Sequence, residues 1–198
     1  VFDLIRNSEL GYRAGGNKLP PQSWPLPNVW LGVSVEDQAA ADERIPLLLD
    51  TPAAVRWISA EPLLGRVDLC EHFGMWWNQT MDCFESVGSR FNRNPNNLAH
   101  TAIDWIVVGG ESGPSARPMS PDWVRSLRDQ CAAAGVPFMF KQWGEWLPML
   151  GQREGIPVKQ TKKTSDGWIM GWAGKKTAGR LLDGVLHDGY PVPRGGAA

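Results

Sequence analysis

The sequence predicts an α/β fold in which parallel strands build part of a (β/α) barrel. Four short apolar runs are rich in β-branched and aromatic residues and are bounded by turn formers, which is typical of buried parallel strands. Each run ends on a glutamate, and parallel α/β folds place their sites at the carboxyl ends of strands. The runs cover residues 29–36, 55–61, 103–111 and 137–145. This pattern indicates an enzyme, or a protein derived from one.

The first strand is expected at residues 29–35, with a helix directly after it. Residues 1–27 are expected to form the end of a helix and a proline-rich linker, because proline excludes helix near the first strand. Asp37 is suited to cap a helix that runs to about Leu49. Pro46 lies inside this helix and can divide it into two pieces.

The second strand is expected at residues 55–60, and an irregular insertion at about 66–102 follows it. The insertion holds clusters of Trp and Phe, few periodic signals and a polar run at residues 92–97. An irregular segment of this length is typical of a lid, a binding loop or a disordered region.

The third and fourth strands, at residues 103–109 and 137–142, flank the clearest helix signal of the chain. Ser120 is a good N-cap, Pro121 suits the first helical position, and Gly135 closes the helix. Strand, helix and strand joined in this way form a βαβ unit, which is almost always right-handed. The barrel portion accordingly covers residues 28–150.

Residues 151–198 form a basic C-terminal extension with a small hairpin around Trp168, Ile169 and Met170, and residues 191–198 are expected to be disordered. From residue 151 onward eight Lys and Arg face four Asp and Glu, so the extension carries +4 and the rest of the chain −5. The net charge of −1 gives no electrostatic case for nucleic acid or membrane binding by the whole molecule. The extension by itself can contact the phosphates of a nucleic acid, although a solvated tail explains the same charges.

The three cysteines are Cys70, Cys83 and Cys131, and their wide spacing contains no C-x-x-C pair. Neither a disulfide framework nor a zinc site is indicated, and the three histidines show no metal-ligand spacing. We therefore expect a reducing, cytoplasmic setting, and the lack of an apolar run of about 18 residues gives no membrane span.

Polar side chains at the strand ends are the candidate site residues. Glu36, Glu61, Glu111 and Lys141 are expected to line the mouth of the barrel, where a buried lysine needs a carboxylate partner. Two glycines at the end of the third strand would let a ligand approach the backbone closely. The remaining candidates are Ser34, Gly109, Gly110, Ser112, Arg117, Gln142 and Glu145.

Four segments resemble a known family, in the order that the family shows. They read NVWLGVSVEDQ at 28–38, RWISAEPLLG at 56–65, WIVVGGESG at 105–113 and FKQWGEW at 140–146, and GRLLDG at 179–184 is similar to the C-terminal signature of the same family. This is the phage-associated, radical S-adenosylmethionine-like family of unknown function, found in phages, prophages and bacteria. The resemblance runs from about residue 25 to 184.

The resemblance implies the later half of a radical S-adenosylmethionine-like barrel acting on a nucleotide, nucleic acid or peptide. It implies S-adenosylmethionine and a [4Fe–4S] cluster as cofactors, but the family's cluster-binding cysteines, in a W-N-P-x-x-G-C context, have no counterpart in this chain. By resemblance Ser34 and Glu36 would face the ribose or methionine part of the cofactor, Glu61 the adenosyl or substrate region, and Gly109 to Glu111 the adenine or substrate side. Together with their places at the strand ends, this gives Glu61, Glu111 and Lys141 as the expected catalytic residues and Ser34, Glu36, Gly109 and Gly110 as the expected cofactor contacts. Substrate contacts would come from Ser112, Arg117, Gln142 and Glu145.

Two alternatives remain open at the level of sequence. A barrel glycoside hydrolase would use two strand-end glutamates as acid and nucleophile, with carboxyl groups about 5–5.5 Å apart. A non-catalytic phage accessory protein would instead bind a partner through the tryptophan-rich insertion.

Overall fold

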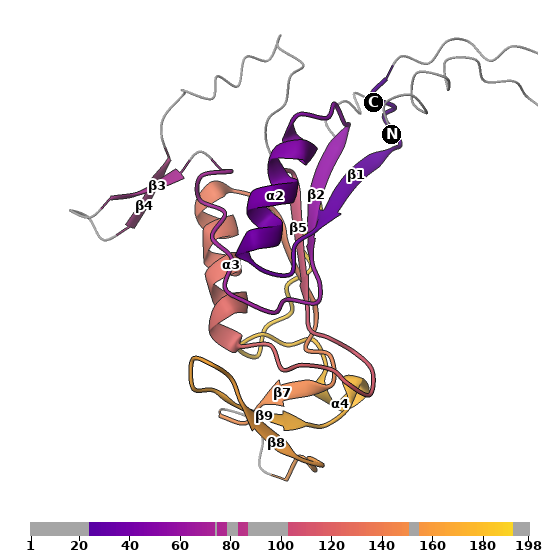
Figure 1. Cartoon of the computed structure of the whole chain (residues 1–198), viewed down its shortest axis with the longest axis vertical. Helices are drawn as coiled ribbons and strands as arrows, with labels where there is room; N and C mark the ends of the chain where they lie inside the picture. Colours follow the sequence, from indigo (N-terminus) through magenta and orange to yellow (C-terminus); the bar gives the residue numbers. More distant parts are fainter. Residues whose placement is uncertain (1–23, 74, 79–82, 87–102, 151–154, 192–198) are drawn as a thin grey trace, which may run out of the picture.

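A four-stranded parallel sheet forms the centre of the protein (Figure 1). The computed structural model describes residues 24–73, 75–78, 83–86, 103–150 and 155–191. The strand order in the sheet is β1-β2-β5-β6, which is also the order of these strands along the chain. The four strands are β1 (Trp30–Ser34), β2 (Val55–Ala60), β5 (Trp105–Gly109) and β6 (Phe138–Gln142). All four predicted strands are confirmed, with ends shifted by two residues at most.

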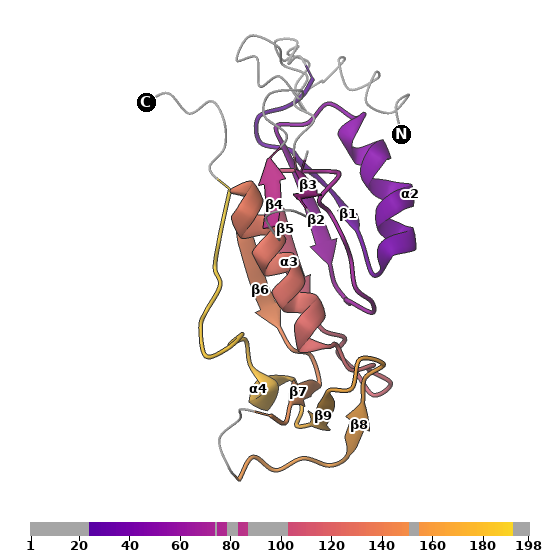
Figure 2. The ribbon, with the colours of Figure 1, turned by 90° about the vertical axis from the view of Figure 1, so that its left-hand side faces the viewer.

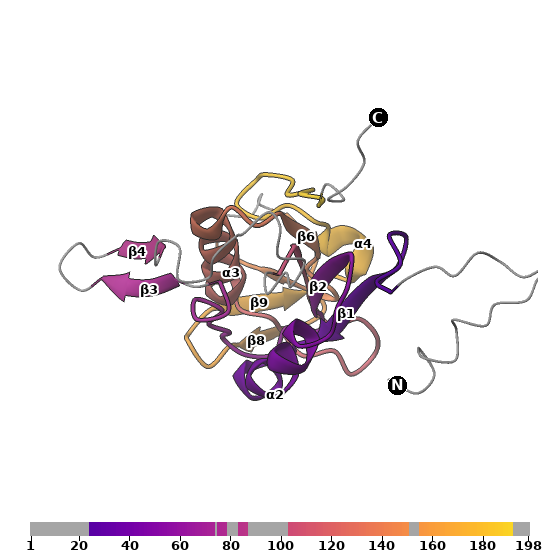
Figure 3. The ribbon, with the colours of Figure 1, turned by 90° about the horizontal axis from the view of Figure 1, so that it is seen from above.

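Two helices, α2 (Gln38–Leu49) and α3 (Pro121–Ala134), cover one face of this sheet (Figure 3). Asp37 caps α2 by accepting a hydrogen bond of 2.9 Å from the Ala40 N–H, and Ser120 caps α3 through the Asp122 N–H. Gly135 ends α3 in the left-handed conformation, at φ 66°. The capping signals in the sequence therefore predicted both helices correctly.

Pro46 does not divide α2, which runs unbroken through it. Proline cannot donate the hydrogen bond that the carbonyl of Asp42 would accept in a regular helix. Because Asp42 and Pro46 are both exposed, water can satisfy that carbonyl. Ile45 and Leu48 stay buried on the opposite side and fix the helix to the sheet.

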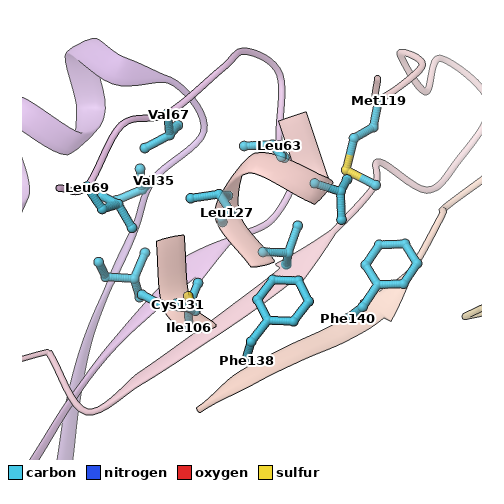
Figure 4. Packing of buried hydrophobic residues seen from close by; sticks show 14 of the residues in the cluster. Val35, Leu63, Val67, Leu69, Ile106, Met119, Leu127, Cys131, Phe138 and Phe140 are labelled. Carbon is cyan, nitrogen blue, oxygen red and sulfur yellow. The ribbon is translucent and has the colours of Figure 1, made fainter. Parts of the chain in front are cut away.

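An extended segment, residues 63–70, packs between the two helices where a regular unit would place another helix. Leu63, Val67 and Leu69 are fully buried and pack beside Leu127 and Cys131 of α3 (Figure 4). The buried Gln130 amide accepts from the Leu69 N–H at 2.6 Å and donates to the Val67 carbonyl at 3.0 Å. The predicted irregular insertion at 66–102 thus begins with residues that belong to the core.

After this segment, β3 (Met75–Asn78) and β4 (Cys83–Ser86) form an antiparallel hairpin. Residues 74, 79–82 and 87–102 of the predicted insertion, which include the polar run at 92–97, lie outside the described residues. The same holds for the predicted helix end at 1–18, for residues 19–23 of the linker and for 192–198 of the tail.

The opposite face of the sheet carries an aromatic cluster. Trp57 lies over β1 at Gly32, where an added Cβ would be 2.4 Å from the indole, so a larger residue cannot replace this glycine without displacing the ring. Trp105 packs against Trp57 and Trp30, and Tyr190 from the end of the described chain packs on Trp30 and Trp105. Among the described residues, aromatic side chains and the C-terminal segment partly cover this face, while the described helices α2 and α3 lie on the other one.

A second, smaller sheet lies beyond the carboxyl ends of the parallel strands (Figures 1 and 2). Its order is β7-β9-β8, with β7 (Trp146–Pro148), β8 (Thr161–Lys163) and β9 (Ile169–Trp172), followed by the short helix α4 (Lys175–Ala178). The predicted hairpin around Trp168, Ile169 and Met170 is confirmed as β8 and β9, and β7 adds a third strand.

The C-terminal segment returns along the outer edge of β6. The Phe140 N–H donates to the His187 carbonyl and the Gly189 N–H donates to the Phe138 carbonyl, both at 2.9 Å. The GRLLDG sequence forms the turn that starts this return, with Leu182 fully buried. Asp183 adopts φ 52° in that turn and pairs with Arg125 and Arg128 of α3 at 2.6 and 3.0 Å.

Among the helices that the structure describes, none has both the length and the apolar character needed to cross a bilayer.

Replacing Asp183 by Asn should destabilise the fold at neutral pH by about 1 kcal/mol, a value reduced for the partial exposure of the ion pairs. Hydrogen bonds and charge from Arg125 and Arg128 lower the pKa of Asp183 in the folded state. The stabilisation that the Asp183 carboxylate contributes is therefore complete above the pKa of Asp in the unfolded chain, about 3.9. It is lost as the pH falls through the lower pKa of the folded state. Asn tolerates the left-handed backbone, so the substitution tests the charge alone. Urea unfolding at pH 7 and pH 3 measures the effect, and an equal loss at both values would contradict the assignment.

Candidate functional site

Glu61 reaches across the sheet from the end of β2 to the end of β6. Its Oε2 atom lies 2.7 Å from the Lys141 Nζ atom, and its Oε1 atom accepts a hydrogen bond of 2.8 Å from the Gln142 Nε2 atom. Since β5 lies between β2 and β6, the carboxylate must pass over β5 to make these contacts. We call Glu61, Gly109, Lys141 and Gln142 the strand-end site.

Gly109 makes this crossing possible. It is the last residue of β5, and an added Cβ there would be 2.9 Å from the Glu61 carboxyl carbon. Any larger residue would therefore push the Glu61 side chain away from β6. The sequence predicted that Gly109 admits a ligand to the backbone, whereas in this structure the space belongs to Glu61.

A bulge in β6 allows two consecutive residues to bind the same carboxylate. The register shifts so that Val108 pairs with Phe140 and Gly109 pairs with Gln142, which leaves Lys141 as the extra residue. Side chains normally alternate between the faces of a strand, and a bulge re-aims them. Lys141 and Gln142 can both contact Glu61 for this reason.

The two partners of Glu61 have different surroundings. Lys141 is exposed and not buried as predicted, although the predicted pairing with a glutamate is confirmed. Gln142 is 6% exposed, and its amide also lies 3.4 Å from the Ser112 hydroxyl. The Oε1 atom of the Glu61 carboxylate can only accept hydrogen bonds. The Gln142 side chain therefore turns its NH₂ group, and not its carbonyl oxygen, toward Glu61.

Gly110 and Gly144 allow two backbone segments to pack closely against each other next to the site. An added Cβ on Gly110 would lie 2.0 Å from the Trp143 carbonyl oxygen, and one on Gly144 would lie 2.1 Å from the Glu111 carbonyl oxygen. The Gly110 N–H donates to the Gln142 carbonyl at 2.9 Å. This close packing explains why position 110 requires a glycine, and the predicted contact of Gly110 with a cofactor stays a prediction.

Glu111 is tied to Arg117 and not to the strand-end site. The guanidinium donates to both carboxylate oxygens at 2.8 Å, and the Arg117 N–H adds a bond of 2.7 Å. These hydrogen bonds hold the pKa of Glu111 below its usual value, so the side chain is a carboxylate at neutral pH. Arg117 is thus paired with a carboxylate of its own chain, and its predicted contact with a substrate stays a prediction.

Glu36 and Ser34, at the end of β1, share a partner that the sequence did not reveal. Arg44 of α2 lies 2.8 Å from the Glu36 carboxylate and 2.8 Å from the Ser34 carbonyl oxygen. Arg44, in the second turn of the helix, can reach back to the strand end. The spacing of these residues in the sequence does not by itself reveal this contact.

Glu145 links the parallel sheet to the small sheet. Its carboxylate accepts from the Gly113 N–H and from the Lys175 N–H, each at 3.2 Å, and its carbonyl accepts from Ala173 and Gly174. Each carboxylate oxygen can accept a further hydrogen bond, and the predicted substrate contact of Glu145 remains a prediction.

The two described cysteine side chains do not suit metal binding. Cys70 and Cys131 are buried on the helix-covered side, and burial raises the pKa of each thiol to about 12. Metals and clusters bind the thiolate, which such burial disfavours. In the described part of the chain, no three His, Cys, Asp or Glu side chains gather in a metal-binding group.

Fold and site together define an α/β protein with a polar site at the carboxyl ends of a parallel sheet. Residues 5–191 match the model of a family described as a protein of unknown function (DUF5131). The chain therefore belongs to the DUF5131 family. No curated protein and no solved structure matches the chain.

Replacing Gly110 by Ala should destabilise the protein by about 3 kcal/mol, the upper end for an overpacked site. The Cβ would meet backbone atoms of Trp143, which cannot move without breaking the strand-end turn. The free energy of unfolding in urea measures the loss.

Gly65→Ala is the matched control, because its Cβ would have an ordinary contact of 3.4 Å with Asp37. We expect a change within about 0.5 kcal/mol for this variant. Equal stability of the two variants would show that the packing around Gly110 is not as described.

Proposed function

We propose that this protein is the later part of a radical S-adenosylmethionine-like enzyme and that its strand ends bind the cofactor and the substrate. The observation that carries the proposal is the polar, partly open strand-end site, in which Glu61, Lys141 and Gln142 converge over Gly109. The resemblance of the four strand-end segments to the radical S-adenosylmethionine-like family supports the same class.

The arrangement of the sheet supports an arc of a barrel. Doubly wound sheets reverse their strand order and place helices on both faces. Here the order β1-β2-β5-β6 never reverses, and α2 and α3 lie on one face. A sheet wound in one direction with helices outside is the geometry of a (β/α) barrel.

The donors and acceptors of the site suit S-adenosylmethionine, which carries an ammonium, a carboxylate and ribose hydroxyls. Glu61 would accept hydrogen bonds from an ammonium or hydroxyl, and the exposed ammonium of Lys141 would bind a carboxylate. Ser34, exposed at the end of β1, would bind the ribose. In the proposed class, S-adenosylmethionine would supply a carbon radical that takes hydrogen from the substrate, and the electron for this cleavage would come from a reductant outside the described residues. The protein's own contribution is to position both molecules and exclude water.

The cluster that such chemistry requires does not fit the cysteines described here, since Cys70 and Cys131 are buried thiols of raised pKa. No step through a cluster follows from these residues. The free thiols agree with a protein that acts in the reducing cytoplasm.

A glycoside hydrolase has less support. Such an enzyme needs one carboxylic acid that holds a proton for the leaving group. Glu111 is kept ionised by Arg117, and donors occupy both oxygens of Glu61. Neither carboxyl group has the environment of a general acid.

The replacement Glu61→Gln should weaken binding of S-adenosylmethionine at least about tenfold, because a charge-assisted acceptor is lost. Isothermal titration calorimetry on the full chain measures the dissociation constant, and an unchanged unfolding midpoint shows that the variant is folded.

Glu43→Gln, the same chemical change at an exposed position of α2, should leave the dissociation constant within twofold. The proposal fails if the unaltered protein does not bind S-adenosylmethionine at millimolar concentration, or if both variants bind equally.

A further inference from the structure

We infer that the small sheet β7-β9-β8, together with α4, is a binding surface for single-stranded nucleic acid. The inference goes beyond the proposed function and does not depend on it, because the residues concerned lie outside the strand-end site. It rests on the distribution of lysine, on the geometry of an edge strand and on a hollow beside that strand.

Lysine is concentrated in this part of the chain. Five of the seven lysines fall between positions 159 and 176, namely Lys159, Lys162, Lys163, Lys175 and Lys176. All five are exposed. The molecule as a whole has a net charge of −1, so this concentration creates a local positive surface on a nearly neutral protein.

The charges of these lysines are not neutralised by neighbouring acids. No ion pair within the described ranges involves any of the five ammonium groups. The acids nearby have other partners: Asp166 accepts from Ser120 and Thr164, Asp183 pairs with α3, and Asp188 pairs with Arg180. The positive surface is therefore free to attract an anion.

Three of the lysines follow one edge of the sheet. β8 is the outermost strand, paired only with β9 on its inner side, and the ladder continues where the Lys159 N–H donates to the Trp172 carbonyl at 2.9 Å. Residues 159–163 thus span about 13 Å of extended edge at about 3.3 Å per residue. Because consecutive side chains of a strand point to opposite faces, Lys162 and Lys163 flank this edge from its two sides, and a polyanion lying along it would have ammonium groups on both sides, with Lys159 further along.

A hollow of about 480 Å³ lies at the end of the same small sheet where β8 turns into β9. Its walls are formed by Met149, Leu150, Gly167, Trp168 and Ile169, with Asp166 at its polar side. Leu150 and Ile169 are 77% and 55% exposed and lie together at this hollow, so they offer an apolar surface to a ligand. Gly167 brings the hollow next to Lys163, whose Cε atom would lie 3.8 Å from a Cβ at that glycine.

Trp168 is held in a fixed position at the wall of this hollow. Its indole N–H donates to Asp122 at 2.8 Å, and the Arg125 guanidinium lies 4.9 Å from the ring centroid. The ring also packs against the hydrophobic core, and the part of it that lines the hollow can contact a flat group without losing further conformational entropy. Lysines beside a fixed aromatic wall are the combination that binds the phosphates and bases of single strands.

The dimensions favour a single strand over a duplex. A duplex is read by a helix or ribbon that enters its major groove, and neither the three-residue β8 nor the four-residue α4 is long enough. The hollow would accept a base only after the base has left the stack. An acidic peptide could meet the lysines, but it offers no flat group to the aromatic wall.

Fluorescence anisotropy with a labelled single-stranded oligonucleotide of 12 thymidines tests the inference on the full chain. We expect binding that weakens with salt. Replacing Lys159, Lys162 and Lys163 by Gln should reduce the slope of log K against log salt by about 2, because each phosphate that a lysine neutralises adds about 0.7 to the slope. Arg66→Gln, at an exposed position next to the core segment, should leave the slope unchanged.

A second pair of variants tests the hollow. Ile169→Glu should weaken binding at least about fivefold by blocking the base, the lower end of the effect of losing one stacked base. Val185→Glu introduces the same charge at a residue of similar exposure, 53%, in the C-terminal turn, and should have a smaller effect.

Three results would overturn the inference. The first is no binding of the oligonucleotide at 50 mM salt, and the second is equal affinity for a duplex of the same sequence. The third is equal or tighter binding of poly-glutamate, which would identify an acidic peptide as the partner. None of these results bears on S-adenosylmethionine binding, so the two proposals fail separately.

Discussion

The organisation of this protein depends on one crossing, in which the Glu61 carboxylate passes over β5 to reach β6. Adjacent strands lie about 4.8 Å apart, so the side chain joins strands that are separated by about two such spacings. The crossing needs a residue without a Cβ at position 109 and a bulge that turns both Lys141 and Gln142 toward one carboxylate. The three strand ends are thereby fixed relative to one another, and the fourth, β1, is held to α2 through Arg44.

The small sheet is attached to this frame at the same edge. Glu145 follows the bulged strand by three residues and binds backbone N–H groups on both sides, at Gly113 and Lys175. The C-terminal segment then covers the outer edge of β6 and is held by the contacts of Asp183 with α3. The carboxyl ends of the parallel strands and the strand β8 therefore lie at one end of the molecule (Figure 2). The hollow is lined by residues of the same small sheet and its turns.

The sequence predicted the elements well because their signals are local. Asp37, Ser120, Pro121 and Gly135 specify helix ends by contacts within a few residues, and the apolar runs specify strands. It predicted that Lys141 pairs with a glutamate, but not which glutamate, and it did not predict the other contacts that assemble the site. Glu61 and Lys141 are 80 positions apart, and their meeting depends on strand order. The sequence also suggested a ligand at Gly109, whereas the space above this glycine is filled by a side chain of the neighbouring strand.

The coupling between Glu61 and Lys141 tests the central claim most directly. A double-mutant cycle of Glu61→Gln and Lys141→Met, followed by urea unfolding, should give a coupling energy of about 0.5–1 kcal/mol. The same cycle in a Gly109→Ala background should give a coupling near zero, because the added methyl group blocks the crossing. An equal coupling energy in both backgrounds would contradict the account, since Glu61 would then reach β6 without the space at Gly109.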